Sequence, residues 1–375
     1  MHLNWNNACS KVLAASVVAM MATTSLYAIP RGPCEVKPVV DCGCPEPAPG
    51  PFAFAFPFDQ NMNCPSDIYF YADFLAFQAK QDGMEFAITD ANGAGSTFLQ
   101  SGTVGGFSGD HRDWTYNFGA RFGLGFYTDH DAWNVDAAWT WLNIRDYRNF
   151  NTGTSGAVEI PLYALGSNTT TAQIGSRSSA VWKSNYNVLD VRLGKPYYIS
   201  RYVVMNPHFG IRGGWISQHF SVDYSGASSV NRTIHHGDND FWGVGLRTGV
   251  DTSWGISSGF SIFGNAAASI LYGKFKVDQN MILGTSGGTG DGFDIEDRHY
   301  MNVPNAEIAL GIAWGTHLSQ NRYYLSFKAA YEFHVWFDQL NMRKFFSGTP
   351  GYANDVVSRG NLTLNGFSFR ASLDL

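Results

Sequence analysis

The sequence predicts an all-β protein, an antiparallel up-and-down barrel of about ten strands that crosses a membrane. Apolar and polar residues alternate with a period of two over most of the chain, which is typical of strands with one apolar face. Charged residues make up only 15% of the 375 residues, while aromatic residues also reach 15%. That balance suits strands that face lipid better than it suits a soluble domain. Long and short links also follow one another in turn along the chain, as they do in outer-membrane barrels.

Residues 1–28 have the features of a secretory signal peptide. Lys11 is the only formally charged side chain before Arg31, and the apolar run 12–22 follows it. This run is too short to span a bilayer as a helix, which takes about 20 residues. We expect cleavage after Ala28 and export to the bacterial outer membrane, where strands would have to do the spanning.

Residues 29–65 form a Pro- and Cys-rich segment ahead of the barrel, and its prolines disfavour regular sheet ladders. Four cysteines lie in it, and none follows in the rest of the chain: Cys34, Cys42, Cys44 and Cys64. In an exported protein disulfides are the expected state, within the chain or to another envelope protein, and the sequence does not choose the pairing. A zinc site is the alternative, although the usual C-x₂₋₄-C spacing is absent.

The barrel is expected over residues 66–375. Residues 67–90 predict one long strand with an interruption near 81–83. The next strand, 114–126, carries seven apolar residues at alternate positions, which a helix would scatter around its circumference. Segment 260–275 is strand-like but apolar on both faces. The eight further strands are 133–141, 189–193, 203–215, 242–254, 260–275, 308–314, 323–337 and 367–375.

The links between these strands alternate in length. Short links are expected at 128–132, 195–202, 255–259 and 315–322. Long links are expected at 91–112, 147–179, 223–240, 276–300 and 338–365. Outer-membrane barrels have short periplasmic turns and long external loops, and an even strand number closes the ring. Because the long links have room for further hairpins, twelve and fourteen strands are the alternatives to ten.

If the apolar rows face lipid, the opposite rows face the lumen. An Arg or Lys that faced lipid at mid-depth would cost roughly 2–4 kcal/mol, which favours the inward orientation. The residues predicted to line a pore are Arg121, Asp136, Asp190, Arg192, His208, Arg212, Arg247, Asp251, Glu307, Lys328, Glu332 and Arg370. One interpretation is a polar pore whose mixed charges select solutes, and the other is a narrow barrel plugged by its own side chains.

Three stretches carry a family resemblance: residues 25–30, residues 68–75 and, most specifically, residues 186–216, which begin YNVLDVRLGKPYY. They resemble the major outer membrane protein-like family of legionellae and chlamydia-related bacteria, over a region from about Ile68 to the C-terminus. The resemblance implies an outer-membrane barrel with porin as the usual function. The N-terminal cysteine cluster is similar to those of disulfide-crosslinked chlamydial envelopes, but the barrel itself lacks cysteine, unlike the chlamydial protein.

The expected function is therefore a water-filled channel for small hydrophilic solutes, without enzymatic activity, cofactor or metal. The expected partners are membrane lipid, the solutes, and further copies of the chain or disulfide-linked envelope proteins. The net charge of −6 provides no basic stripe for nucleic acid. The first alternative is a structural or adhesive barrel with a plugged lumen.

The second alternative is a barrel enzyme with an acid/base cluster at its rim. Its candidate residues are His235, His236, Asp238 and Asp240. Another polar cluster, in a Gly-rich stretch, contains Asp291, Asp294, Glu296 and Asp297. This group lacks the spacing of a Ca²⁺-binding loop, so a solvated external loop is the preferred interpretation.

Overall fold

The computed structural model describes residues 68–90, 103–107, 115–128, 133–151, 158–163, 177–200, 202–225, 232–257, 259–285, 288–319, 322–347 and 353–375. Every regular element in these ranges is a strand, which confirms the all-β prediction. None of the described segments is a helix of the length and hydropathy that a membrane crossing requires. The signal peptide, the segment 29–65 and its four cysteines lie outside the described residues, so the statements about them stay predictions.

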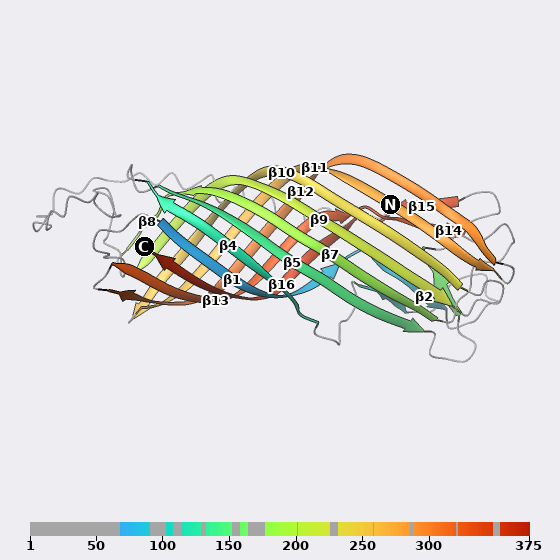
Figure 1. Cartoon of the computed structure of the whole chain (residues 1–375), viewed down its shortest axis with the longest axis horizontal. Helices are drawn as coiled ribbons and strands as arrows, with labels where there is room; N and C mark the ends of the chain where they lie inside the picture. The colour runs from blue at the N-terminus through green and yellow to red at the C-terminus, as the bar shows by residue number, and fades with distance from the viewer. Residues whose placement is uncertain are drawn as a thin grey trace, which may run out of the picture. The chain divides into compact units, whose positions relative to one another are not determined.

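Ten of these strands close into an antiparallel barrel (Figure 1). Each pairs with the next barrel strand along the chain, and the last pairs with the first. On β1, Asp73 lies opposite Arg121 of the following barrel strand on one side and opposite Arg370 of the last strand on the other. The confirmed strand number is thus ten. The barrel strands are β1 (Ile68–Gln81), β4 (Asn117–Tyr127), β5 (Asn134–Asn151), β7 (Arg177–Gly194), β9 (Val203–Ser225), β10 (Arg232–Ser257), β11 (Phe260–Thr285), β12 (Gly288–Leu318), β13 (Tyr323–Leu340) and β16 (Gly360–Asp374).

An apolar belt surrounds the outside of the barrel. Its members alternate along the strands and are exposed, with Leu246 at 75% and Leu310 at 64%. Aromatic side chains mark both edges of the belt, as in the girdles of outer-membrane barrels. Those at one edge include Trp141, Trp215, Trp242 and Tyr272, and those at the other include Trp254, Trp314 and Tyr323. The predicted outward orientation of the apolar rows is correct.

Several strands continue well beyond the belt, so two expected long links are wrong. The β9–β10 link occupies only 226–231 instead of 223–240, and the β11–β12 link only 286–287 instead of 276–300. The cause is a reversal of the alternation at the belt edge. On β11, the exposed apolar residues of the belt end at Tyr272, whereas Phe275 and Val277 beyond it are apolar but buried inside. Because the apolar residues change face here, alternation of a single phase predicts strands that end too early.

The remaining long links carry short strands of their own. Residues 67–90 are not one strand, because the chain turns at Gly83 (φ 86°) and then forms β2 (Glu85–Asp90) in a separate sheet with β3 (Val104–Gly106) and β6 (Val158–Pro161). The left-handed φ at Gly83 suits a residue without a Cβ. The link after β13 holds the hairpin of β14 (Arg343–Ser347) and β15 (Ala353–Val357).

The two ends of the barrel differ in their links. The short links between β4 and β5, β7 and β9, β10 and β11, and β12 and β13 all lie at the end that holds the C-terminus, together with β8 (Tyr197–Tyr198) (Figure 1). β2, β14 and β15 lie at the other end. By the rule for outer-membrane barrels, the C-terminal end is periplasmic and the other end faces the outside.

Candidate functional site

The inner wall of the barrel carries the charges that the sequence predicted. Ten of the twelve predicted pore-lining residues border an internal cavity, and Asp136 and His208 are buried beside it. They come from eight different strands, so no short stretch of sequence contains the site. That they line a conducting pore stays a prediction.

The first ion-pair cluster is centred on Asp73, which sequence reasoning missed. Its carboxylate accepts hydrogen bonds from Arg121 at 2.8 Å and from Arg370 at 2.7 and 2.8 Å. Arg121 also reaches Glu332 at 2.9 Å, and Glu332 lies 2.9 Å from a ring nitrogen of His334. Because β1 has Tyr71, Leu75 and Phe77 on the same face as Asp73, both faces of this strand look apolar in sequence. The sequence signal that could have identified Asp73 is that it is the only acidic residue of β1.

The second cluster joins β7, β9, β10 and β12. Arg212 forms a bidentate pair with Asp190 at 2.6 and 2.7 Å and also contacts Glu307. Arg247 donates to the other oxygen of Glu307 at 3.0 Å and lies 3.0 Å from His208. Bidentate guanidinium–carboxylate pairs fix geometry as well as energy. The cluster therefore holds the two arginines in defined positions against the wall.

A third cluster surrounds Tyr71. Arg192 binds Asp136 at 2.8 and 2.6 Å, and the Tyr71 hydroxyl donates to Asp136 at 2.9 Å. The Arg370 guanidinium lies 4.0 Å above the Tyr71 ring. The ring can lie flat along the wall because its neighbour on β4 is Gly123, where a Cβ would collide with it. Asp251 is 3.7 Å from Arg192 and links this cluster to β10.

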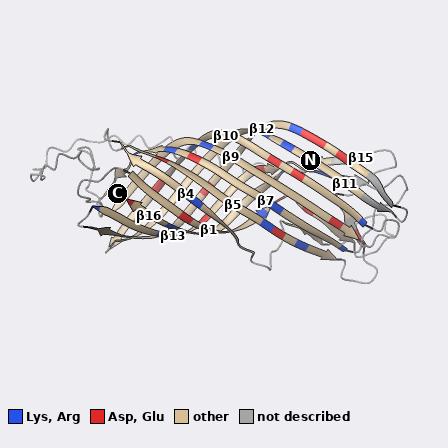
Figure 2. Ribbon diagram, in the orientation of Figure 1, with Lys and Arg blue, Asp and Glu red and all other residues tan. Residues whose placement is uncertain are grey.

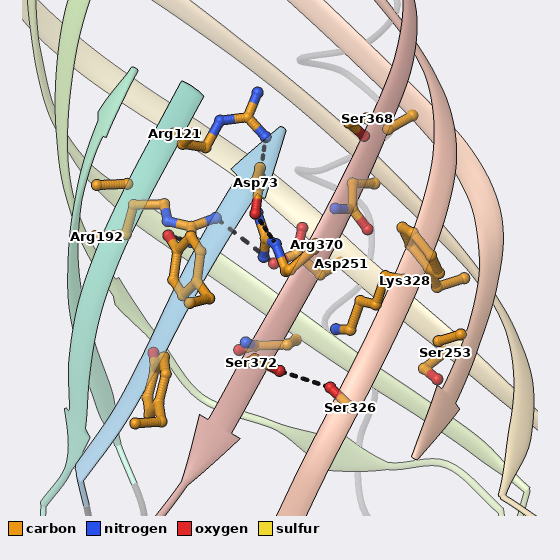
Figure 3. A pocket seen from close by; sticks show the side chains of 18 of the residues that line it. Asp73, Arg121, Arg192, Asp251, Ser253, Ser326, Lys328, Ser368, Arg370 and Ser372 are labelled. Carbon is orange, nitrogen blue, oxygen red and sulfur yellow. Dashed lines mark hydrogen bonds and ion pairs between the residues drawn. The ribbon is translucent and has the colours of Figure 1, made fainter. Parts of the chain in front are cut away.

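These charges surround a cavity of about 460 Å³ that reaches the short-link end of the barrel. Figure 3 shows Asp73, Arg121, Arg192, Asp251, Lys328 and Arg370 directed into it. Lys328 and Asp374 also border the cavity, and neither forms an ion pair or hydrogen bond with another described residue. Fixed charges of both signs beside water-accessible space can attract or repel ionic solutes.

On the loop side the cavity ends at an apolar plug, which we define as the buried residues that the long links insert into the barrel: Met84, Phe86, Phe107, Leu162, Tyr163 and Met342. Phe107 packs 6.0 Å from both Trp182 and Phe220 of the wall, measured between ring centroids. Hydrogen bonds fasten the links to the wall. One runs from the Tyr224 hydroxyl to the Phe86 carbonyl at 2.7 Å, and another runs from the Arg343 backbone to Gln279 at 2.7 Å.

Below the plug, two wall residues meet across the full width of the barrel. The Trp336 indole on β13 donates to the Tyr186 hydroxyl on β7 at 3.3 Å. β13 and β7 are five strands apart in either direction around the ring, and both side chains are buried. The described residues therefore fill the interior at this level, as expected for a barrel of so few strands.

The four residues considered for an acid/base cluster do not converge. His235 is fully buried inside the barrel, with its ring centroid 4.7 Å from that of Tyr163, and burial lowers the pKa of its imidazole to about 3. Asp238 lies on the opposite face of β10, where it pairs with His219 at 2.6 Å on the exposed outer wall. Among the described residues no three His, Cys, Asp or Glu side chains come close enough together to hold a metal ion. The absence of enzymatic activity stays a prediction.

A closed antiparallel barrel with an apolar outer belt, a charged interior and short turns at the C-terminal end defines an outer-membrane β-barrel protein. Residues 66–375 match the family described as Legionella pneumophila major outer membrane protein precursor, and the chain belongs to this family. This match confirms the resemblance inferred from residues 68–75 and 186–216 and supports the outer-membrane location. No curated protein matches the chain.

Several solved structures are distantly similar. The outer membrane protease OmpT from Escherichia coli shares 10% identity, with 82% of this chain and 96% of that chain covered and a TM-score of 0.35. A FadL homologue from Pseudomonas aeruginosa shares 8% identity, with coverages of 82% and 89% and a TM-score of 0.24. The toluene transporter TodX from P. putida shares 8% identity, with coverages of 83% and 91% and a TM-score of 0.20. Likeness at this level carries no inference about activity.

Proposed function

We propose that the protein is an outer-membrane porin for small hydrophilic solutes, closed by the apolar plug and opened when the link segments leave the lumen. The observation that carries this proposal is the cavity of about 460 Å³ with ten of the predicted pore-lining charges around it. A barrel that served only as a structural wall would have no need of a water-accessible charged chamber.

The position of the plug supports a channel that opens by moving links. Phe86 lies on β2 and the other plug residues lie in link segments, all outside the ring of paired barrel strands. Their removal would leave every strand-to-strand ladder of the barrel intact. Link segments are the parts of a fold that move at low cost, so the plug can leave without breaking the strand ladders of the wall. A continuous path also requires the Trp336 and Tyr186 side chains to separate.

Single-channel conductance of the refolded full chain in planar bilayers tests the proposal. Phe107→Ala removes a ring that joins the plug to Trp182 and Phe220, so it should make discrete conductance steps several-fold more frequent than in the unaltered chain. Phe122→Ala, on the lipid-facing side, is the matched control and should leave their frequency unchanged. Arg192→Gln should shift ion selectivity toward cations.

The second candidate is a structural barrel that stays closed. Trp336 bridges to Tyr186 across the lumen, and the plug forms one continuous apolar core with the wall, which favours this candidate. Silence from the Phe107→Ala protein, once it is shown to be folded and inserted, would reject the porin proposal and leave the closed barrel.

A further inference from the structure

The outer wall of β5 and β7 changes character just beyond the apolar belt. The apolar belt on β5 ends at Trp141, and Asn143 and Arg145 follow it on the same face, ahead of the exposed Tyr147. On β7, Asn187, Asn185 and Lys183 lie on the same outer face. Each is the register partner of one β5 residue: Asn187 of Trp141, Asn185 of Asn143 and Lys183 of Arg145. We call this outward group the β5–β7 ladder: Trp141, Asn143, Arg145, Lys183 and Asn185.

The two cations of the ladder are direct neighbours, and no described residue supplies a counter-charge to them. Arg145 and Lys183 are direct register partners and both are exposed. Neither makes an ion pair or a hydrogen bond through its side chain with any described residue. Like charges directly opposite each other on a sheet face are destabilising. This arrangement therefore lowers the stability of the free wall unless an anion binds between the two side chains.

Beyond the belt on β9 to β12, the outward cations are arranged differently, because each of the following has an acidic neighbour. These pairs are His219 with Asp238, Lys276 with Asp278 and Arg298 with Glu296. Figure 2 shows Lys and Arg positions on both β5 and β7 on the loop side of the barrel. The ladder differs from these three pairs because two cations, Arg145 and Lys183, are direct register partners.

We propose that the β5–β7 ladder binds the headgroup of a phosphorylated glycolipid of the outer leaflet. The position fits, because four residues of a tilted strand place Arg145 roughly 10 Å above Trp141, in the headgroup layer of the bilayer. A guanidinium offers two parallel donors to a phosphate, and an ammonium adds a compact second charge.

The lower part of the ladder suits a sugar. The Asn143 side-chain amide donates to the side-chain oxygen of Asn185 at 3.2 Å, which leaves the Asn143 oxygen and the Asn185 NH₂ group available to a ligand on the exposed face. These groups complement sugar hydroxyls. Trp141, which is 40% exposed, lies beneath them at the boundary between acyl chains and headgroups, where indole rings are favoured.

Native mass spectrometry of the purified full chain, titrated with three lipids, tests the assignment. The lipids are a bisphosphorylated disaccharide glycolipid, its dephosphorylated form and phosphatidylglycerol. The unaltered chain should bind the phosphorylated glycolipid most tightly, and the double variant Arg145→Gln/Lys183→Gln should weaken that binding about tenfold or more. Binding of the dephosphorylated form should be the same in both proteins. The matched control, Lys276→Gln/Arg298→Gln, removes two outward cations with acidic neighbours and should bind like the unaltered chain.

Two results would overturn the proposal. An equal loss of glycolipid in the control variant would mean that overall wall charge, and not the ladder, holds the lipid. Equal binding of phosphatidylglycerol would mean that the ladder recognises phosphate without the sugar. The ladder side chains are exposed, so their substitution should leave the barrel folded, which the heat-dependent gel mobility of each variant checks.

Discussion

Asp73 is the residue on which most of the inner charge network depends. It is almost fully buried, yet it accepts three hydrogen bonds from two guanidinium groups on the strands either side of β1. Removing one partner from a buried ion pair leaves the other charge uncompensated, which costs more than the pair itself contributes. The two arginines would have to find water or another acid.

Asp73→Asn should therefore lower the free energy of unfolding by roughly 3–5 kcal/mol. Asp82→Asn is the control, because Asp82 pairs with Lys80 at 3.6 Å on the exposed surface, and such pairs contribute about 1 kcal/mol or less. Guanidinium titration of both variants in lipid vesicles, followed by tryptophan fluorescence, measures the difference. Equal losses would contradict the central position of Asp73.

The inward residues could be predicted from sequence, but their partners could not. Alternation of the two faces along each strand correctly assigned Arg192, Arg212 and Arg247 to the inner wall. Which acid each arginine meets depends on register between strands far apart in the chain, and Asp73 and Arg370 are 297 positions apart. Asp73 was not predicted to face inward, because apolar residues occupy both faces of β1 and alternation therefore assigns neither face to the lumen.

At the scale of elements, the sequence predicted the part of each strand that faces lipid and missed the part beyond it. The apolar phase reverses where the belt ends, as between Tyr272 and Phe275 on β11, because the plug gives the inner face an apolar surface to bury. The plug itself is formed by links such as β2 and β6, whose short strands carry too few residues for a periodic signal.

A buried acid on β6, close in sequence to the plug residues Leu162 and Tyr163, makes the plug sensitive to pH. Glu159 on β6 is fully buried, and its polar neighbour Ser178 on β7 makes no hydrogen bond of full geometry with either carboxylate oxygen. Burial raises the pKa of Glu159 from its usual range to about 7. Below the ordinary carboxyl pKa of about 4.3 both the packed and the displaced link are protonated, so packing carries no penalty. As the pH rises from there through about 7, the displaced carboxyl ionises first, and the packed plug loses stability.

Hydrogen–deuterium exchange of 85–90 and 158–161, corrected for the intrinsic exchange rate, should therefore be faster at about pH 8 than at about pH 5. Glu159→Gln cannot ionise, and its exchange in these segments should not respond to pH in this range. A response of the same size in the Gln variant would assign the effect to another group. Strand β11 within the belt serves as the internal reference, because its ladder is independent of the links.

At the scale of the whole molecule, the barrel has an apolar outer belt that is suited to lipid and an inner wall of ion pairs that is suited to water. Leu246 lies in the middle of the lipid-facing row of β10, between Ile211 and Ile270 of the adjacent strands. All three side chains are exposed in the isolated chain. Only a surrounding hydrocarbon layer removes so much apolar surface from water.

Leu246→Arg should thus destabilise the folded protein in vesicles by roughly 2–4 kcal/mol, the cost of a cation near the bilayer midplane. Ser221→Arg places the same side chain on the outer wall of β9 beyond the belt, where water hydrates it, and should change the unfolding free energy by about 0.5 kcal/mol or less. The difference between the two variants, measured by guanidinium titration from the same vesicles, reports the depth of each position. If both variants lost the same stability, the belt would not mark the membrane, and the assignment of the polar upper wall to the headgroup layer would fail with it.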